Sequence, residues 1–225
     1  MVEYPIQVHE KTQSPSPEER IKAIKYIYDN IHDFGDIKGV WEDLHRLTQD
    51  EDEEVRRRAI GALGRVFAYI PDKGEAWEDL RRLTQDEDED VRRKAADTLG
   101  WVFADLPDKC RAWEDLRRLI QDEDVRLCAI NALGRTFAFV PDKDEAWKYL
   151  HRLTQDKDKQ VRWIAADALG WAFAFVPDKD KAWEDLHRLT QDEDVRLCAT
   201  DALGWAAEYM PDKRRAREDI QRLSR

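Results

Sequence analysis

One block of sequence recurs along this chain of 225 residues. Each copy opens with Trp-Glu-Asp-Leu or a close variant and continues through an acidic turn, Val-Arg, Ala-Leu-Gly and Pro-Asp-Lys. The leading tryptophans are Trp41, Trp77, Trp113, Trp147 and Trp183, and Arg217 holds that place in an incomplete sixth copy. The intervals are 36, 36, 34, 36 and 34 residues. Such a period is typical of solenoids, whose units bury their apolar faces only by stacking.

The copy over 77–112 is predicted to form two helices. In the first, Trp77, Leu80 and Leu83 recur at helical spacing, so the charged residues between them, including Asp79, are expected on the exposed side. An acidic turn over 86–90 follows, and its carboxylates are placed to cap the next helix. The second helix begins near Val91 and ends at Pro107. Its expected core stripe is Val91, Ala95, Thr98, Leu99, Val102, Phe103 and Leu106.

The two ends of the chain depart from the full repeat. Residues 1–15 match nothing in it and are interpreted as a tail or an extended capping segment. We expect one solenoid domain over 16–225, with helix pairs between two single helices that act as caps. Its parts are a capping helix at 17–34, repeats at 41–76, 77–112, 113–146, 147–182 and 183–216, and a terminal capping helix at 217–225. The prediction is therefore an all-α, right-handed solenoid of twelve helices, two for each repeat and one for each cap.

The acidic turn, the Val-Arg that opens the second helix and the Ala-Leu-Gly at its middle resemble the HEAT family, in particular the phycobilisome-lyase-type HEAT-like repeats. The resemblance covers residues 17–225 and implies that an Asp of each turn and the Arg after each Val form a structural ladder. The matching arginines are Arg56, Arg92, Arg126, Arg162 and Arg196. A tetratricopeptide repeat is the alternative, because its length and leading Trp are similar. However, the Gly expected after the first Leu is His45, Arg81 or Arg117.

Comparison of the copies identifies positions of the second helix that vary. A position that holds Arg in one copy and Trp in another is expected to reach solvent, and the variable positions fall on one side of the helix. The candidate partner-binding residues are Arg57, Arg58, Arg65, Arg93, Lys94, Asp97, Trp101, Asn131, Arg135, Trp163, Asp167, Trp171, Asp201 and Trp205. The family resemblance implies that this side lines the concave surface, where partners bind.

The candidate surface changes character along the chain. Its N-terminal part is basic and its C-terminal part is apolar and aromatic. Tryptophan and arginine often dominate the binding energy of protein interfaces. We therefore expect a protein or peptide partner with an apolar stretch beside an acidic one. The alternative is that these tryptophans only cover one another or the neighbouring helices.

Charge and hydropathy limit the classes of partner and location. The net charge of −11 argues against a protein that mainly binds nucleic-acid phosphates. There is no long apolar run and no secretory signal pattern at the N-terminus, so we expect a cytoplasmic protein without a membrane span. The charged helices favour a monomer, or a weak homodimer through the tryptophan groove.

No catalytic residue, metal site or cofactor is predicted. The acidic turns lack the glycine and spacing of an EF-hand, and Cys110, Cys128 and Cys198 are interpreted as reduced thiols. The histidines His45, His151 and His187 share a position that is Arg elsewhere, so they are expected to be exposed, and His9 and His32 are isolated. A HEAT-like DNA-glycosylase-type nucleic-acid binder and a bilin lyase-like protein remain as alternatives drawn from the family resemblance.

Overall fold

The computed structural model describes residues 3–35 and 37–223, and the described chain is built from α-helices and short 3-10 turns. It divides into two compact units, Met1–Asp108 and Lys109–Arg225. Unit 1 contains α1 (Ile6–Thr12), α2 (Pro17–Asn30), α3 (Lys38–Leu47), α4 (Glu53–Val66), α5 (Lys73–Leu83) and α6 (Glu89–Val102). Unit 2 contains α7 (Lys109–Leu119), α8 (Arg126–Thr136), α9 (Lys143–Leu153), α10 (Lys159–Ala172), α11 (Lys179–Leu189), α12 (Arg196–Ala206) and α13 (Lys213–Leu223).

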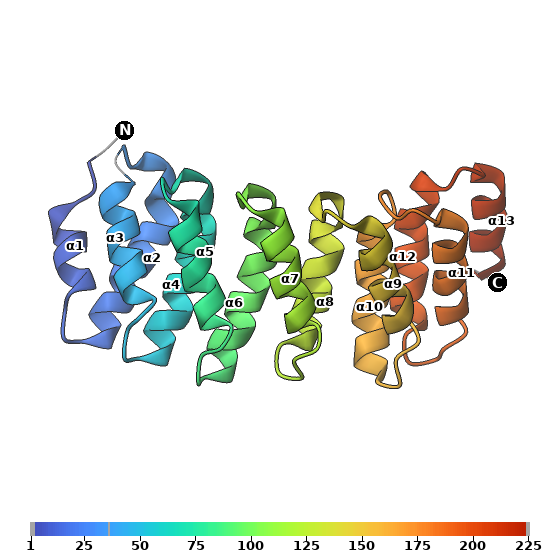
Figure 1. The fold of residues 1–225 in the computed structure, drawn as a ribbon, viewed down its shortest axis with the longest axis horizontal. Helices are drawn as coiled ribbons and strands as arrows, with labels where there is room; N and C mark the ends of the chain where they lie inside the picture. The colour runs from blue at the N-terminus through green and yellow to red at the C-terminus, as the bar shows by residue number, and fades with distance from the viewer. Residues whose placement is uncertain (1–2, 36, 224–225) are drawn as a thin grey trace. The chain divides into compact units, whose positions relative to one another are not determined.

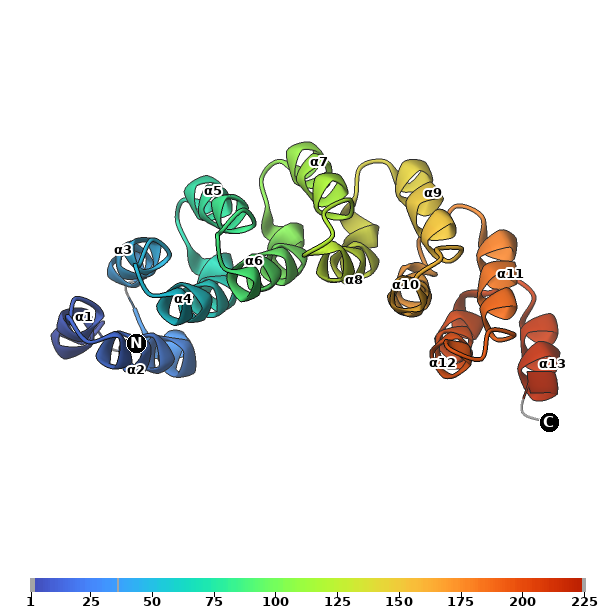
Figure 2. The same cartoon turned by 90° about the horizontal axis from the view of Figure 1, so that it is seen from below.

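Within each unit the helices form two layers. Figure 1 shows the helices in chain order, and Figure 2 shows that the odd-numbered helices of unit 1 lie on one side and the even-numbered helices on the other. In unit 2 the odd-numbered and even-numbered helices separate in the same way. The even-numbered helices pack on one another in the order α2, α4, α6 in unit 1 and α8, α10, α12 in unit 2. This arrangement confirms the predicted stack of helix pairs.

Aspartates of the turns determine where the helices begin. The carboxylate of Asp52 accepts a hydrogen bond of 3.0 Å from the backbone amide of Val55, and Asp88 accepts one of 2.9 Å from Val91. The Asp of Pro-Asp-Lys also acts as a cap, since Asp72 accepts from the amide of Glu75 at 3.0 Å. Helices α5, α9 and α11 therefore begin at the residue after a capping Asp, four residues before their tryptophans.

The two repeats of 34 residues, at 113–146 and 183–216, have no side-chain cap on their second helix. Helices α8 and α12 have 11 residues, whereas α4, α6 and α10 have 14. Their N-cap positions are Val125 and Val195, which have no side-chain oxygen to offer to the helix. The two residues that these repeats lack therefore shorten the second helix at its start, and neither N-cap side chain bonds to the helix backbone.

The core follows the predicted apolar stripes. All seven residues of the stripe from Val91 to Leu106 are buried, and so are the five leading tryptophans. The glycine of Ala-Leu-Gly permits close contact between adjacent second helices. A Cβ atom on Gly134 would lie 2.5 Å from the Cα atom of Ala168, and one on Gly64 would lie 2.7 Å from Cγ2 of Thr98. Within each unit, the spacing of α4 from α6 and of α8 from α10 therefore depends on these glycines.

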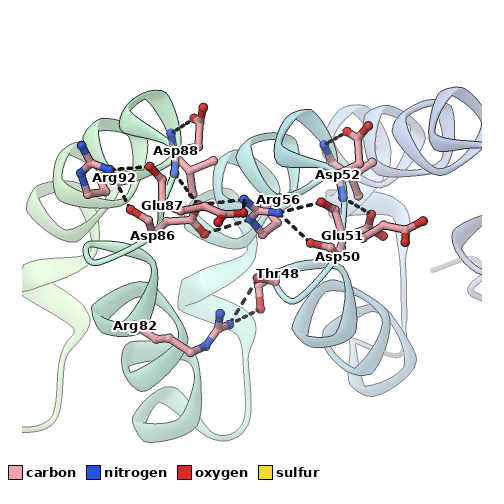
Figure 3. A network of polar contacts seen from close by, with 12 residues as sticks. Thr48, Asp50, Glu51, Asp52, Arg56, Arg82, Asp86, Glu87, Asp88 and Arg92 are labelled. Carbon is pink, nitrogen blue, oxygen red and sulfur yellow. Dashed lines mark hydrogen bonds and ion pairs between the residues drawn. The ribbon is translucent and has the colours of Figure 1, made fainter.

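An arginine–aspartate ladder joins successive turns, as the family resemblance implied (Figure 3). Two guanidinium nitrogens of Arg56 donate to the carboxylate of Asp86 at 2.8 and 2.9 Å, and a third donates to the carbonyl of Asp50 at 2.9 Å. Burial raises the pKa of Asp86, but the hydrogen bonds from Arg56 and from the backbone of Asp88 outweigh burial, so the net pKa is lowered. Equivalent pairs are Arg20 with Asp50, Arg126 with Asp156, and Arg162 with Asp192.

Two further arginines of the predicted ladder lie near the start of α6 and α12. Arg92 donates to the carbonyls of its own turn, at 2.7 Å to Asp86 and 2.9 Å to Glu87 (Figure 3). Arg196, at the start of α12, is exposed. Direct carboxylate pairing is therefore described for Arg56, Arg126 and Arg162 among the five.

The interpretation of residues 1–15 as a tail requires a correction. Residues 6–12 form α1, in which Val8 and Thr12 are buried. The Nδ1 atom of His9 lies 2.9 Å from Asp43, and Arg46 donates to the carbonyl of Thr12 at 2.9 Å. The same contacts recur one repeat later, from His45 to Asp79 and from Arg82 to Thr48, so α1 is a divergent first helix.

The chain carries a signal for α1 that motif matching missed. Val8, His9, Thr12 and Gln13 occupy the places of Leu44, His45, Thr48 and Gln49. The leading Trp-Glu-Asp is replaced there by Pro-Ile-Gln, so this copy lacks the tryptophan that marks the others. At the other end, the terminal helix expected at 217–225 is α13, which begins at Lys213, and residues 224 and 225 lie outside the described residues.

The predicted exposure of the first-helix Asp residues was also wrong, and the His residues that were expected to be exposed are half-buried. Asp43, Asp79, Asp115 and Asp185 are buried, with no more than 5% of their surface exposed. The Nδ1 atoms of His45 and His151 lie 2.6 Å from carboxylate oxygens of Asp79 and Asp185 in the next repeat. These side chains are directed toward the neighbouring repeat, because their hydrogen bonds cross from one first helix to the next.

Candidate functional site

The variable positions lie on the even-numbered helices, on a side that we call the second-helix face. In unit 1 this face is formed by α2, α4 and α6, and it carries the predicted residues Arg57, Arg58, Arg65, Arg93, Lys94, Asp97 and Trp101. In unit 2 it is formed by α8, α10 and α12, and it carries Asn131, Arg135, Trp163, Asp167, Trp171, Asp201 and Trp205. The predicted basic and aromatic parts therefore fall in different units.

The unit 1 face has two adjoining pockets. One, of about 520 Å³, is lined by residues that include Tyr28, Arg57, Arg58, Gly61 and Lys94. The other, of about 470 Å³, is lined by Tyr28, Gly61, Gly64, Arg65, Lys94, Thr98 and Trp101. Tyr28, Gly61 and Lys94 line both pockets. Five of the seven predicted unit 1 residues therefore surround a shared hollow; the other two, Arg93 and Asp97, do not line it.

The cations of unit 1 differ in how far they are neutralised. Arg57 and Arg58 both donate to the carboxylate of Glu54, at 2.7 Å in each case. The guanidinium of Arg65 lies over the ring of Tyr28, with its central carbon 4.8 Å from the ring centre. Arg93 pairs with Glu89. Lys94 is half-buried, and no contact with a carboxylate is described for it within unit 1.

Trp101 has the most exposed tryptophan side chain in the described part of the chain, at 63%. Its indole N–H donates to the carboxylate of Asp97 one helical turn earlier, at 3.4 Å. The ring forms part of the wall of the smaller pocket. The indole is thus a large apolar surface beside a group of cations.

The unit 2 face carries a row of stacked side chains. The Arg135 guanidinium lies 5.5 Å from the ring centre of Trp171, and Trp171 lies 6.5 Å from Trp205 at an interplanar angle of 22°. Trp171 and Trp205 remain 38% and 47% exposed. Both of the sequence-based hypotheses for these tryptophans therefore describe part of the geometry, since the rings cover one another and still present surface to solvent.

A buried thiol connects α12 to α10 beneath this face. The Cys198 thiol donates to the carboxylate of Asp167 at 3.1 Å and to the backbone carbonyl of Trp163 at 3.3 Å. Burial raises the pKa of the Cys198 thiol strongly, and the adjacent Asp167 carboxylate raises it further. This cysteine is therefore held as a neutral hydrogen-bond donor, which suits a structural role.

Several exposed aromatics escaped the sequence analysis. Phe139, Phe175 and Tyr209 are about half exposed and lie one helical turn beyond Arg135, Trp171 and Trp205. Tyr69 holds this position in unit 1. The available signal was the aromatic residue that four of the five copies place two residues before Pro-Asp-Lys. Tyr28 was missed because it replaces the repeat glycine only in the first copy.

Metal sites and membrane spans are two further features that the described residues can be checked for. The described residues contain no group of three or more His, Cys, Asp or Glu side chains arranged to hold a metal ion. Among the described helices, none combines the length and the apolar character needed to cross a membrane.

Comparison with known families identifies the class of this chain. The HEAT repeats family matches residues 42–123, 82–170 and 116–204. The chain therefore belongs to the HEAT-repeat family, which confirms the predicted fold over the tetratricopeptide alternative. A comparison with curated protein sequences gives no match.

Solved structures agree on the fold. Importin beta is similar with a TM-score of 0.63 and 19% identity, over 96% of this chain and 32% of that one. Kap95 in its complex with Nup1 gives a TM-score of 0.64 and 17% identity, over 91% of this chain and 30% of Kap95. One chain in the structure of the CpcE–CpcF complex of phycocyanin lyase from Nostoc sp. PCC7120 gives a TM-score of 0.58 and 18% identity, over 99% of this chain and 96% of that one. This chain thus spans about a third of the first two proteins and nearly all of the third.

Proposed function

We propose that this chain is a cytoplasmic, non-catalytic scaffold that binds a protein or peptide on its second-helix face. The observation that carries the proposal is the aromatic surface of unit 2. Six aromatic side chains on or next to α8, α10 and α12 are between 38% and 53% exposed. They are Phe139, Trp163, Trp171, Phe175, Trp205 and Tyr209.

An exposed surface of this kind favours association. Burial of apolar area contributes roughly 25 cal/mol per Å², and contiguous apolar patches on soluble proteins often mark interaction sites. Tryptophan and arginine are also enriched among the residues that dominate interface energies. Because the stacked helices already hold Arg135, Trp171 and Trp205 in order, a partner loses little free energy in arranging them.

Structural neighbours of the same fold bind other proteins. Kap95 is known in a complex with Nup1 and with RanGDP, and CpcE is known in a complex with CpcF. The repetition of the candidate positions supports a binding role over catalysis, since a catalytic site needs a unique group of residues. We infer that the chain is a monomer, or a weak homodimer through the aromatic surface.

The proposal can be tested by selecting peptides from a display library on the purified chain and then measuring the binding of the enriched peptides to the double variant Trp171→Ala/Trp205→Ala. The expected result is a set of apolar-rich peptides that bind the natural chain and lose binding to the double variant. Tyr26→Ala is the matched control, because Tyr26 is an exposed aromatic of unit 1 that lines neither pocket. Enriched peptides that bind the double variant equally well would contradict the proposal.

Thermal unfolding of the same variants separates binding from stability. We expect the melting temperature of the double variant to stay close to that of the natural chain, because both rings are partly exposed. A large drop would mean that these tryptophans mainly hold the repeats together.

A bilin lyase-like role is the second candidate, and the observation that favours it is the match in length with one chain of the CpcE–CpcF complex. The second-helix face of unit 2 would then hold a bilin pigment. Addition of a bilin to the chain should produce a shifted pigment absorbance in that case. Unchanged absorbance at pigment excess would remove this candidate.

A further inference from the structure

The two adjoining pockets of unit 1, which we now call the unit 1 pocket, meet where one copy of the repeat lacks an acidic or amide side chain. The position three residues before the Ala-Leu-Gly glycine holds Asp97, Asn131, Asp167 and Asp201 in the other copies, whereas α4 has Gly61. Gly61 does not need its conformational freedom, because no positive φ angle occurs among the described residues. The absence of a side chain there leaves the floor of both pockets open.

In unit 2, the position equivalent to Gly61 carries a carboxylate that contacts the next second helix. There, Cys198 donates to the carboxylate of Asp167 in the preceding repeat at 3.1 Å. Lys94 holds the place of Cys198, and Gly61 holds the place of Asp167. A Cβ atom on Gly61 would lie 3.5 Å from Cε of Lys94, so the two positions face each other. The half-buried side chain of Lys94 therefore passes next to a place where the repeat elsewhere supplies a carboxylate.

The surroundings of this place are positive, although the whole chain carries a net charge of −11. Lys25, Arg57, Arg58, Arg65 and Lys94 line the two pockets. Asp29 is the acidic residue among their lining residues, and it is already paired with Lys25 at 2.6 Å. Arg57 and Arg58 share the single carboxylate of Glu54. Lys94 and Arg65 thus present positive charge that no described carboxylate of unit 1 offsets.

From this geometry we infer that the unit 1 pocket binds a carboxylate side chain of an acidic segment of a partner protein. The carboxylate takes the place that Asp167 has in unit 2 and pairs with Lys94, with Arg65 beside it. An apolar side chain of the same segment packs against Tyr28 and Trp101, which form the walls. The inference deepens the proposed scaffold function and rests on it.

A nucleic acid fits this pocket less well than an acidic protein segment. Nucleic-acid binding depends on cations that neutralise successive phosphates along a backbone. Here the cations surround a hollow with glycine at its floor, and the carboxylates of Asp29 and Glu54 pair with three of them. A single carboxylate that enters the hollow meets positive charge, while a longer polyanion also meets these acids.

The test uses a short fluorescein-labelled peptide of alternating glutamate and leucine, with the glutamine–leucine peptide as its neutral counterpart. Fluorescence anisotropy at low salt should show binding of the glutamate peptide only. Lys94→Gln and Gly61→Asp should each weaken binding by about tenfold or more, because one removes the cation and the other supplies an internal carboxylate. Gly61→Ala is the matched control and should bind much more tightly than Gly61→Asp.

Trp101 provides a second measurement at the site. Its indole N–H signal in a ¹H–¹⁵N spectrum is assigned by its loss in Trp101→Phe, and the glutamate peptide should shift it in the natural chain but not in Lys94→Gln. Circular dichroism verifies that each variant is folded. Lys94→Gln keeps the test valid if Gly61→Asp does not fold.

Three outcomes would overturn the inference. They are absence of binding by the glutamate peptide, equal binding by the natural chain and Lys94→Gln, and tighter Lys94-dependent binding of a single-stranded oligonucleotide, which would indicate nucleic acid. If glutamate-peptide binding is insensitive to Lys94→Gln but lost in Trp171→Ala/Trp205→Ala, the scaffold function stands and only the carboxylate pocket is wrong.

Discussion

Asp79 illustrates how single residues stabilise the contact between repeats. Its carboxylate is buried, lies 2.6 Å from Nδ1 of His45 and accepts from Arg82 at 3.2 Å. Arg82 also donates to the hydroxyl of Thr48 in the preceding repeat at 3.1 Å. The position that looked like part of a charged, exposed helix side is therefore the centre of a polar contact between α3 and α5.

We predict that Asp79→Ala destabilises the chain more than His45→Ala. Loss of the carboxylate leaves His45 and Arg82 without their shared partner, and loss of hydrogen bonds of this kind costs about 1–3 kcal/mol. After His45→Ala, Arg82 still pairs with Asp79, so the expected cost is nearer about 0.5–1 kcal/mol. Urea unfolding of both variants measures the difference, and equal losses would show that the histidine is the main partner.

At the scale of the helices, the distance between neighbouring second helices depends on glycine. Gly134 in α8 faces the backbone of Ala168 in α10, whereas a Cβ atom on Gly204 in α12 would meet nothing within 4 Å. The same Ala-Leu-Gly motif thus has a packing role in one helix and no described contact in another. The two glycines form a natural pair for comparison.

We predict opposite effects for alanine at these two glycines. Gly134→Ala places a methyl group against the α10 backbone, and such overpacking costs about 1–3 kcal/mol. Gly204→Ala meets no neighbour and should stabilise α12 by up to about 1 kcal/mol, because glycine is a poor helix former. Chemical denaturation provides both values, and destabilisation by Gly204→Ala would contradict the open space described around it.

At the scale of the whole molecule, each repeat contacts mainly its neighbours within a unit. Helix α1 packs on α2 and α3, and its contacts repeat those of the later first helices. In such linear folds, stability is the sum of repeat terms and nearest-neighbour interface terms. A change at α1 should therefore act most strongly on its immediate neighbours.

We predict that Val8→Asp weakens unit 1 locally. Val8 is 8% exposed, so the substitution places a charge against the apolar side of the stack. Hydrogen exchange should speed up in α2 and α3 and remain nearly unchanged in α10 and α12. Ile6→Asp is the control, since Ile6 is 74% exposed on the same helix. Equal loss of protection along the entire chain would argue against nearest-neighbour coupling.

The sequence by itself determined the helix pairs and the core stripes and indicated that the acidic turns cap the helices, and the family resemblance implied the arginine–aspartate ladder. The helix pairs and the core stripes depend on local spacing that recurs from copy to copy, so the comparison of copies reveals them. The variable residues of the second-helix face were also predictable, because exchange between Arg and Trp is compatible only with solvent contact.

Only the tertiary structure decided the features that depend on which surfaces meet. The burial of Asp79, the identity of α1 as a first helix and the opposition of Lys94 to Gly61 all involve residues 33 to 34 positions apart on adjacent repeats. Helical periodicity assigns a residue to a side of its own helix, but it does not say whether that side faces water or the next repeat. The packing of neighbouring helices supplies that information, because it brings together side chains that no local pattern connects.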